Sequence, residues 1–177
     1  MRRALTLSLV AVSLSAIAAE EAAPKSPSDI SPDGRFLVQR FAEAIQMIDI
    51  RSQQRYPETG VLPGYIVRWM PDSRTAVALQ HVHGGSLATA VHFDGAEWQK
   101  FDTTPSDRYF DYVGVVDLRP DDRSLRVVYR SDVRGDDHQS THFLVTIDVD
   151  FAAGAMREHA KPISYQRYAR LHDVAQP

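Results

Sequence analysis

Apolar and polar side chains alternate along much of the chain after residue 35, with the period of two that β-strands have. In residues 141–151, one face would carry Phe143, Val145, Ile147, Val149 and Phe151, and the other would carry His142, Leu144, Thr146, Asp148 and Asp150. Leu144 is the one large apolar residue on the second face. The pattern therefore predicts a strand that is buried on one side only.

Residues 75–82 show a different pattern, because both faces are apolar. Val77 and Leu79 fall on one face, and Ala76, Ala78 and Val82 fall on the other. Apolar residues on both faces are typical of a strand in the middle of stacked sheets. We therefore expect this segment to be covered on two sides.

One turn pattern, x-Pro-Asp-x-Arg, occurs three times: Ser31-Pro32-Asp33-Gly34-Arg35, Met70-Pro71-Asp72-Ser73-Arg74 and Arg119-Pro120-Asp121-Asp122-Arg123. Proline fixes φ at the first corner of a tight turn, and aspartate accepts hydrogen bonds from nearby amides. A strand-like segment follows each turn, at 35–41, 75–82 and 124–131. A second strand-like segment follows each of these, at 48–50, 92–94 and 147–149. Two of the turns are also preceded by a strand-like segment, at 65–70 and at 112–118. This order predicts repeated four-stranded units.

The three segments with the x-Pro-Asp-x-Arg pattern resemble the blade motif of TolB-type β-propellers. A similar repeat occurs in the propeller domains of prolyl oligopeptidase-like enzymes. The resemblance implies blade-like antiparallel sheets that serve as a scaffold for binding. A closed propeller needs about four to eight blades, whereas this chain has two full units and one that lacks its first strand. We expect an all-β fold, either a partial propeller or a β-sandwich; a tail that completes the third unit and an assembly of copies are the alternatives.

The C-terminal tail is the one segment with helical spacing. Tyr165, Tyr168, Leu171 and His172 recur at that spacing after Pro162, and Ser164 could cap the first turn. The tail therefore predicts a short helix, although the same residues would also fit a last strand.

The N-terminus has a composition of its own. Arg2 and Arg3 precede an apolar stretch, residues 4–17, and Ala16-Ile17-Ala18 has the small-x-small form of a cleavage site. These features predict a signal peptide over residues 1–18, since the stretch is shorter than the roughly 20 residues that span a bilayer; an uncleaved anchor is the alternative. A flexible leader at 19–30 and a single β domain at 31–177 follow.

The predicted export and the composition together limit the classes of function that we expect for the protein. Cleavage removes two of the 20 basic residues and none of the 23 acidic ones, which leaves 159 residues with a net charge of −5. The absence of cysteine excludes disulfides, a thiolate nucleophile, cysteine-ligated metals and a lipid anchor. Nucleic acid is not an expected partner, because phosphate binding needs a clustered basic face. We expect a periplasmic or secreted protein without a cofactor and without a membrane anchor after cleavage.

Two histidines, His81 and His83, are the first candidate functional residues. His81 and His83 would share one face of a strand, but a Gly84-Gly85 hairpin turn would place His92 opposite Val77, about 13 Å along the strand from His81. Three-histidine metal coordination does not follow, so we interpret His81 and His83 as strand-end surface residues available to a partner. His83-Gly84-Gly85-Ser86 lacks the last glycine and the helix of a nucleophile elbow.

The loop from Asp132 to His138 is the second candidate. It is the most polar loop, and Asp132, Arg134, Asp136, Asp137 and His138 are its candidate binding residues. It lacks the full acidic spacing of a calcium loop, so no metal is predicted. Loops on rigid β scaffolds often carry recognition, which makes this loop a candidate partner contact.

Other aromatic and acidic residues have a plainer interpretation. Trp69, Trp98 and the neighbouring aromatic residues of the strands are expected in the core. Asp107 and Asp111 are expected to be charged loop residues. The sequence thus favours a non-catalytic exported binding protein with a protein partner, of the inhibitor or immunity kind, and a small exported hydrolase or glycan-active enzyme is the alternative.

Overall fold

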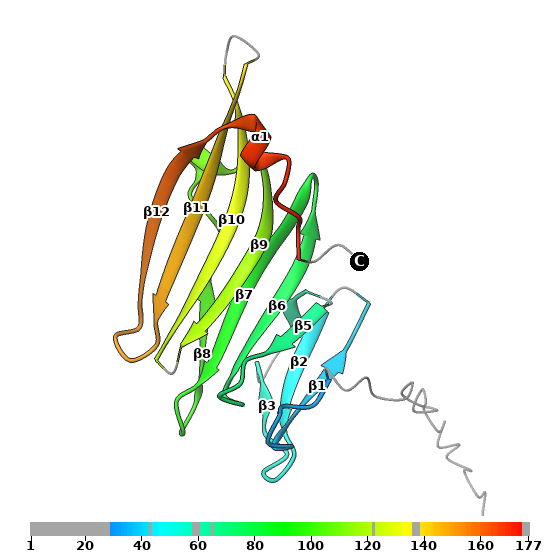
Figure 1. The fold of residues 1–177 in the computed structure, drawn as a ribbon. Coiled ribbons are helices and arrows are strands. Elements are labelled where there is room, and N and C mark those ends of the chain that lie inside the picture. Colours follow the sequence, from blue (N-terminus) through cyan, green and yellow to red (C-terminus); the bar gives the residue numbers. More distant parts are fainter. Residues whose placement is uncertain are drawn as a thin grey trace, which may run out of the picture.

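The computed structural model describes residues 29–42, 44–57, 61–64, 66–121, 123–135 and 139–174. The predicted signal peptide and residues 19–28 of the predicted leader lie outside these ranges. The described chain forms three antiparallel sheets of four strands and two short helical turns (Figure 1). This confirms the predicted all-β antiparallel fold. None of the three sheets closes on itself within the described ranges.

The sheets follow one another along the chain. The first sheet contains β1 (Phe36–Arg40), β2 (Ala44–Asp49), β3 (Arg55–Tyr56) and β4 (Leu62–Pro63). The middle sheet contains β5 (Ile66–Trp69), β6 (Thr75–Val82), β7 (Gly85–Phe93) and β8 (Trp98–Asp102). The last sheet contains β9 (Tyr112–Asp121), β10 (Ser124–Arg134), β11 (Ser140–Asp150) and β12 (Ala155–Ile163). The 3-10 helix η2 (Asp107–Tyr109) precedes β9, and α1 (Tyr165–Tyr168) follows β12. The predicted short helix is confirmed at residues 165–168, and the alternative of a last strand over the same residues is wrong, because β12 ends before them at Ile163.

The middle sheet is covered on both faces, as the pattern of residues 75–82 predicts. Val77 and Leu79 pack into a core shared with the last sheet. Ala76 and Ala78 pack into a second core, shared with the first sheet. All four side chains are fully buried.

The predicted one-sided burial of residues 141–151 is confirmed, with one exception. Val145, Ile147 and Val149 of β11 are buried in the core against the middle sheet. His142 is buried as well, although it lies on the polar face. It stacks on Tyr168 of α1, with 4.6 Å between the ring centroids. The short helix therefore covers one end of that face.

Aromatic side chains fill the core between the first and middle sheets. The Phe36 ring lies 4.8 Å from the Trp98 ring and 6.1 Å from the Trp69 ring, centroid to centroid. The Arg35 guanidinium lies over the Phe36 and Phe93 rings. The expected core position of the two tryptophans is confirmed, since both pack against this cluster while staying half-buried.

The first two Pro-Asp turns form as predicted. Asp33 Oδ1 accepts a hydrogen bond from the Arg35 amide, and Asp72 Oδ1 accepts one from the Arg74 amide. The third copy is different, because Pro120 and Asp121 belong to β9 and pair with Leu125 and Ser124. Proline is tolerated at such a position because β9 is an edge strand of its sheet.

The outer face of the last sheet is charged. Arg126 and Asp148 form a two-bond ion pair there (2.6 and 3.2 Å). Arg157, His159 and Lys161 are exposed on the same face of β12. A further sheet packed on this face would bury these charges at a large cost in solvation. The stack of sheets therefore ends here.

We expect the Arg35–Asp49 ion pair to make stability depend on pH. Burial alone would raise the pKa of Asp49, but hydrogen bonds from Arg35 and from the Arg51 and Ser52 amides outweigh burial and hold this pKa below its usual value. A carboxyl whose pKa is lowered by folding stabilises the protein above its unfolded pKa, and this contribution is lost as the pH falls through the folded pKa.

Asp49→Asn should therefore show a smaller loss of unfolding free energy between pH 7 and pH 3 than the wild type, by about 1 kcal/mol or less. Urea denaturation at the two pH values measures this difference. The exposed Asp107 provides the control, and Asp107→Asn should follow the wild type. An equal loss in the wild type and Asp49→Asn would show that the ion pair adds no stability.

Candidate functional site

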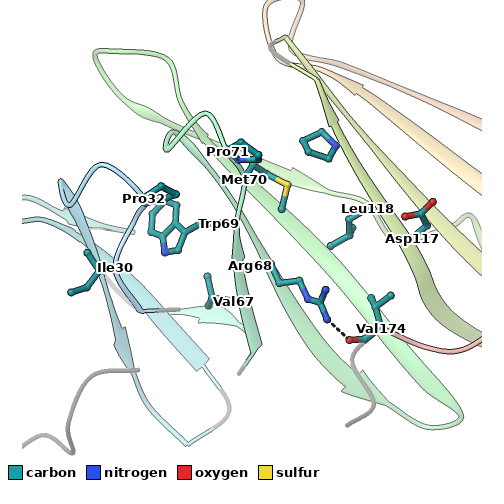
Figure 2. Close-up of a pocket in the computed structure, with 11 residues that line it drawn as sticks. Ile30, Pro32, Val67, Arg68, Trp69, Met70, Pro71, Asp117, Leu118 and Val174 are labelled. Atoms are coloured by element: carbon teal, nitrogen blue, oxygen red, sulfur yellow. Dashed lines mark hydrogen bonds between the residues drawn. The ribbon is translucent and has the colours of Figure 1, made fainter. Parts of the chain in front are cut away.

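A cleft of the described chain lies between the turn before β1, strand β5 and strand β9. We call it the central cleft, a hollow of about 640 Å³ (Figure 2). It is lined by Ile30, Pro32, Val67, Arg68, Trp69, Met70, Pro71, Asp117, Leu118, Pro120 and Val174. Its volume falls in the range of about 300–1,000 Å³ that is typical of ligand pockets, and most of its lining side chains are apolar.

The three copies of the Pro-Asp pattern line this cleft together. Each copy contributes its proline and the residue two positions before it, which are Ile30 and Pro32, Trp69 and Pro71, and Leu118 and Pro120. From the sequence, the repeat was interpreted as a scaffold and this site was not predicted. The signal was the repeat itself, because the same two positions of each copy line the cleft.

Two strand edges border the central cleft. The middle sheet ends at β5, and the last sheet ends at β9. The Met70 amide donates to the Thr75 carbonyl, toward β6. Because backbone groups alternate in direction along a strand, the neighbouring Trp69 N–H and C=O point to the open edge. The cleft therefore presents backbone groups as well as apolar side chains.

The C-terminal segment occupies one end of the gap between these edges. The Val174 amide donates to the Val115 carbonyl of β9 (2.7 Å), and Arg68 Nη2 donates to the Val174 carbonyl (2.8 Å). One residue earlier, Asp173 Oδ1 accepts from the buried Ser86 hydroxyl (2.7 Å), which in turn accepts from the Val115 amide. The end of the described chain is thus held against the edge of β9 at Val115, and Figure 2 shows the Arg68–Val174 hydrogen bond beside it.

Charged groups in the central cleft are few. Asp117 is its one carboxylate, and its Oδ2 accepts from Arg119 Nε. Arg68 is exposed, and the described residues place no carboxylate within ion-pair distance of its guanidinium. Within the described ranges, Arg68 is therefore a cation of the cleft without an ion-pair partner.

The predicted histidine pair lies elsewhere and in a different geometry. The β6–β7 turn is at His83-Gly84, not at Gly84-Gly85, because Gly85 already belongs to β7 and Gly84 takes the positive φ of the turn. His81 is therefore at the end of β6 and His83 is in the turn, so they do not form the predicted strand pair. Both side chains are exposed.

The corrected register also moves His92. It pairs with Thr75 instead of Val77, with Nδ1 2.9 Å from the Thr75 hydroxyl. Burial lowers the pKa of His92, whose ring stacks on Phe151. His92 is thus six residues along β6 from His81. Within the described ranges, no three histidine or carboxylate side chains converge to hold a metal ion.

The structure places Asp132 and Arg134 not in a loop, as predicted, but in β10, where they pair with His142 and Ser140 of β11. Asp132 Oδ1 is 3.3 Å from His142 Nδ1, close enough for an ion pair when the histidine is protonated but not aligned for a hydrogen bond. The Arg134 amide donates to Asp111 Oδ2 (2.8 Å). Asp136, Asp137 and His138 lie outside the described residues.

The structure brings two of the predicted regions to one end of the molecule. The His83 ring lies 5.9 Å from the Tyr112 ring, and Tyr112 pairs with Asp132 across β9 and β10. None of these residues lines the central cleft. The predicted binding residues and the cleft are therefore two separate surfaces.

No known protein family matches the chain, and none of the curated protein sequences matches it. In the part of the chain that the structure describes, no helix has the length and apolar character needed to cross a membrane.

Proposed function

We propose that the protein is a non-catalytic, exported binding protein that engages another protein through the central cleft, in the manner of an inhibitor or immunity protein. In this proposal the three sheets are blades of a TolB-type repeat that serves as a scaffold. The protein would act in the periplasm or outside the cell, without a cofactor.

The kinds of side chain that line the central cleft are the main support for this proposal. General acid–base catalysis uses titratable groups placed together on the substrate. The central cleft has Asp117 as its one carboxylate, already engaged by Arg119, and no histidine. Its apolar and aromatic lining is instead typical of a recognition site. The alternative, a hydrolase or glycan-active enzyme, would need His81 or His83 beside a carboxylate in a concave site, and both lie outside the cleft.

A matched pair of variants tests the proposal. Ile30 is 37% exposed and lines the cleft, whereas Ile50 is 42% exposed and does not. Ile30→Asp places a charge in the apolar cleft, and Ile50→Asp places the same charge outside it. Pull-downs from envelope extract with the wild type and both variants, quantified by mass spectrometry, should identify a protein that Ile30→Asp captures at least tenfold less than Ile50→Asp. Equal capture by both variants, or no enriched protein with the wild type, would overturn the proposal.

We expect the double variant His81→Ala, His83→Ala to keep its biological activity, because neither side chain lines the cleft or forms part of a catalytic arrangement. Partner capture within twofold of the wild type, with an unchanged melting temperature, is the expected result. A large loss of activity in a variant that is still folded would instead support the enzyme alternative.

A further inference from the structure

The edge of β9 in the central cleft has backbone groups placed to receive another strand. Tyr129 and Val127 lie two positions apart on β10, and their partners on β9 are Val115 and Leu118. The Val115 N–H and C=O point away from β10, since they bond to Ser86 and Val174. Leu118 lies three positions after Val115, but a bulge in β9 lets it pair with Val127, two positions from Tyr129 on β10, so the Leu118 N–H and C=O also point to the open edge.

A backbone amide of the C-terminal segment already uses this edge. Val174 hydrogen-bonds to Val115 at one end of the cleft. The edge continues past this contact to Leu118, with Pro120 beyond it, and both line the cleft. Because Pro120 has no N–H, an added strand would gain its full pair of hydrogen bonds at Leu118 and end near Pro120.

Side chains around this edge define the chemistry of the occupant. Ile30, Trp69 and Met70 offer apolar contacts, whereas Arg68 offers a guanidinium that no described carboxylate neutralises. An extended segment with apolar side chains and one carboxylate would complement both features. A second copy docked by its last sheet is a poor fit, because the outer face of that sheet is charged.

We propose that the central cleft binds an extended, largely apolar segment of the partner protein that carries one carboxylate, added as a strand along β9 beyond Val174. This rests on the proposed function and specifies how the same cleft is used. The main-chain hydrogen bonds at Leu118 supply affinity, and the side-chain contacts at Ile30, Trp69 and Arg68 supply specificity.

Selected peptides provide the test. Random octapeptides displayed on phage are selected on the purified protein, and the strongest binders are synthesised for fluorescence polarisation. We expect peptides enriched in apolar residues with one Asp or Glu, whose affinity falls at least tenfold in Ile30→Asp and stays within twofold in Ile50→Asp. Methylation of one backbone amide that faces β9 should abolish binding, whereas methylation of the adjacent amides should leave it within threefold.

Each of the other possible results would overturn one or both of the two proposals. Cleft-dependent peptides that tolerate methylation at every amide would overturn strand addition and leave the proposed function standing. A cleft-dependent protein in the pull-down, without any cleft-dependent peptide, would show that a folded surface binds there and would overturn the extended segment. Failure of both experiments would overturn both proposals. A dimer that Ile30→Asp dissociates would identify a second copy as the occupant and would also contradict this inference.

Discussion

Gly85→Ala is expected to destabilise the protein by about 3 kcal/mol, at the upper end of the usual cost of overpacking. Gly85 does not have a left-handed backbone conformation, so alanine would be acceptable in isolation. However, its Cβ would lie 1.8 Å from the Val113 carbonyl oxygen of β9. Because the obstacle is backbone, the middle and last sheets would have to move apart, which would disturb the core between them.

Urea denaturation of the wild type and the variant measures this effect. Gly34→Ala is the control, since Gly34 has a positive φ of 73° but nothing within 4 Å of its Cβ. This control should lose only about 1 kcal/mol, the cost of the strained backbone. If Gly85→Ala were as stable as Gly34→Ala, the close approach of β7 and β9 would be wrong.

Tyr129→Phe is expected to destabilise the protein by about 1–3 kcal/mol, the cost of a buried polar group that has lost its partner. The Tyr129 hydroxyl reaches from β10 into the middle sheet, where it accepts from the Ala88 amide (3.0 Å) and lies 3.1 Å from the Thr103 hydroxyl. Pairing between β7 and β8 begins only at Thr89. The hydroxyl thus satisfies a backbone group that β8 does not reach.

Stability measurements at alkaline pH distinguish the role of the Tyr129 hydroxyl from the packing of its ring. Burial raises the pKa of Tyr129 well above its usual value of about 10, despite the opposing hydrogen bonds. A raised folded pKa means that stability falls as the pH rises above the unfolded pKa. The wild type should therefore lose more unfolding free energy between pH 9 and pH 11 than Tyr129→Phe. The control Tyr109→Phe, in a half-buried ring of the same core, should leave stability and this slope within about 0.5 kcal/mol of the wild type.

Local patterns were sufficient to predict most of the fold. Alternation located β6 and β11 and the face that each one buries, because side-chain direction in a strand depends on position alone. The first two Pro-Asp turns formed as expected, because their hydrogen bonds involve neighbours in the sequence. Ser164 caps α1 through the Arg167 amide for the same reason.

Long-range contacts explain what the sequence did not predict. The β6–β7 pairing differs from the predicted one by two positions, and Gly85, which was expected in the turn, packs instead on β9, 28 residues along the chain. His142 is buried by a helix that packs on it from the end of the chain. The central cleft combines residues from three repeats and the tail, and no window of the sequence contains it. Such features depend on how the sheets pack, which local patterns do not encode.

Site-specific photo-crosslinking tests directly whether the central cleft binds a segment of a protein partner. A photoreactive benzoylphenylalanine is placed at Ile30 or, as the control, at Ile50, and the cells that naturally produce the protein are irradiated. We expect one protein adduct that forms at position 30 and not at position 50, with the cross-link in a short continuous segment of the partner. No adduct at position 30, or equal adducts at both positions, would contradict it.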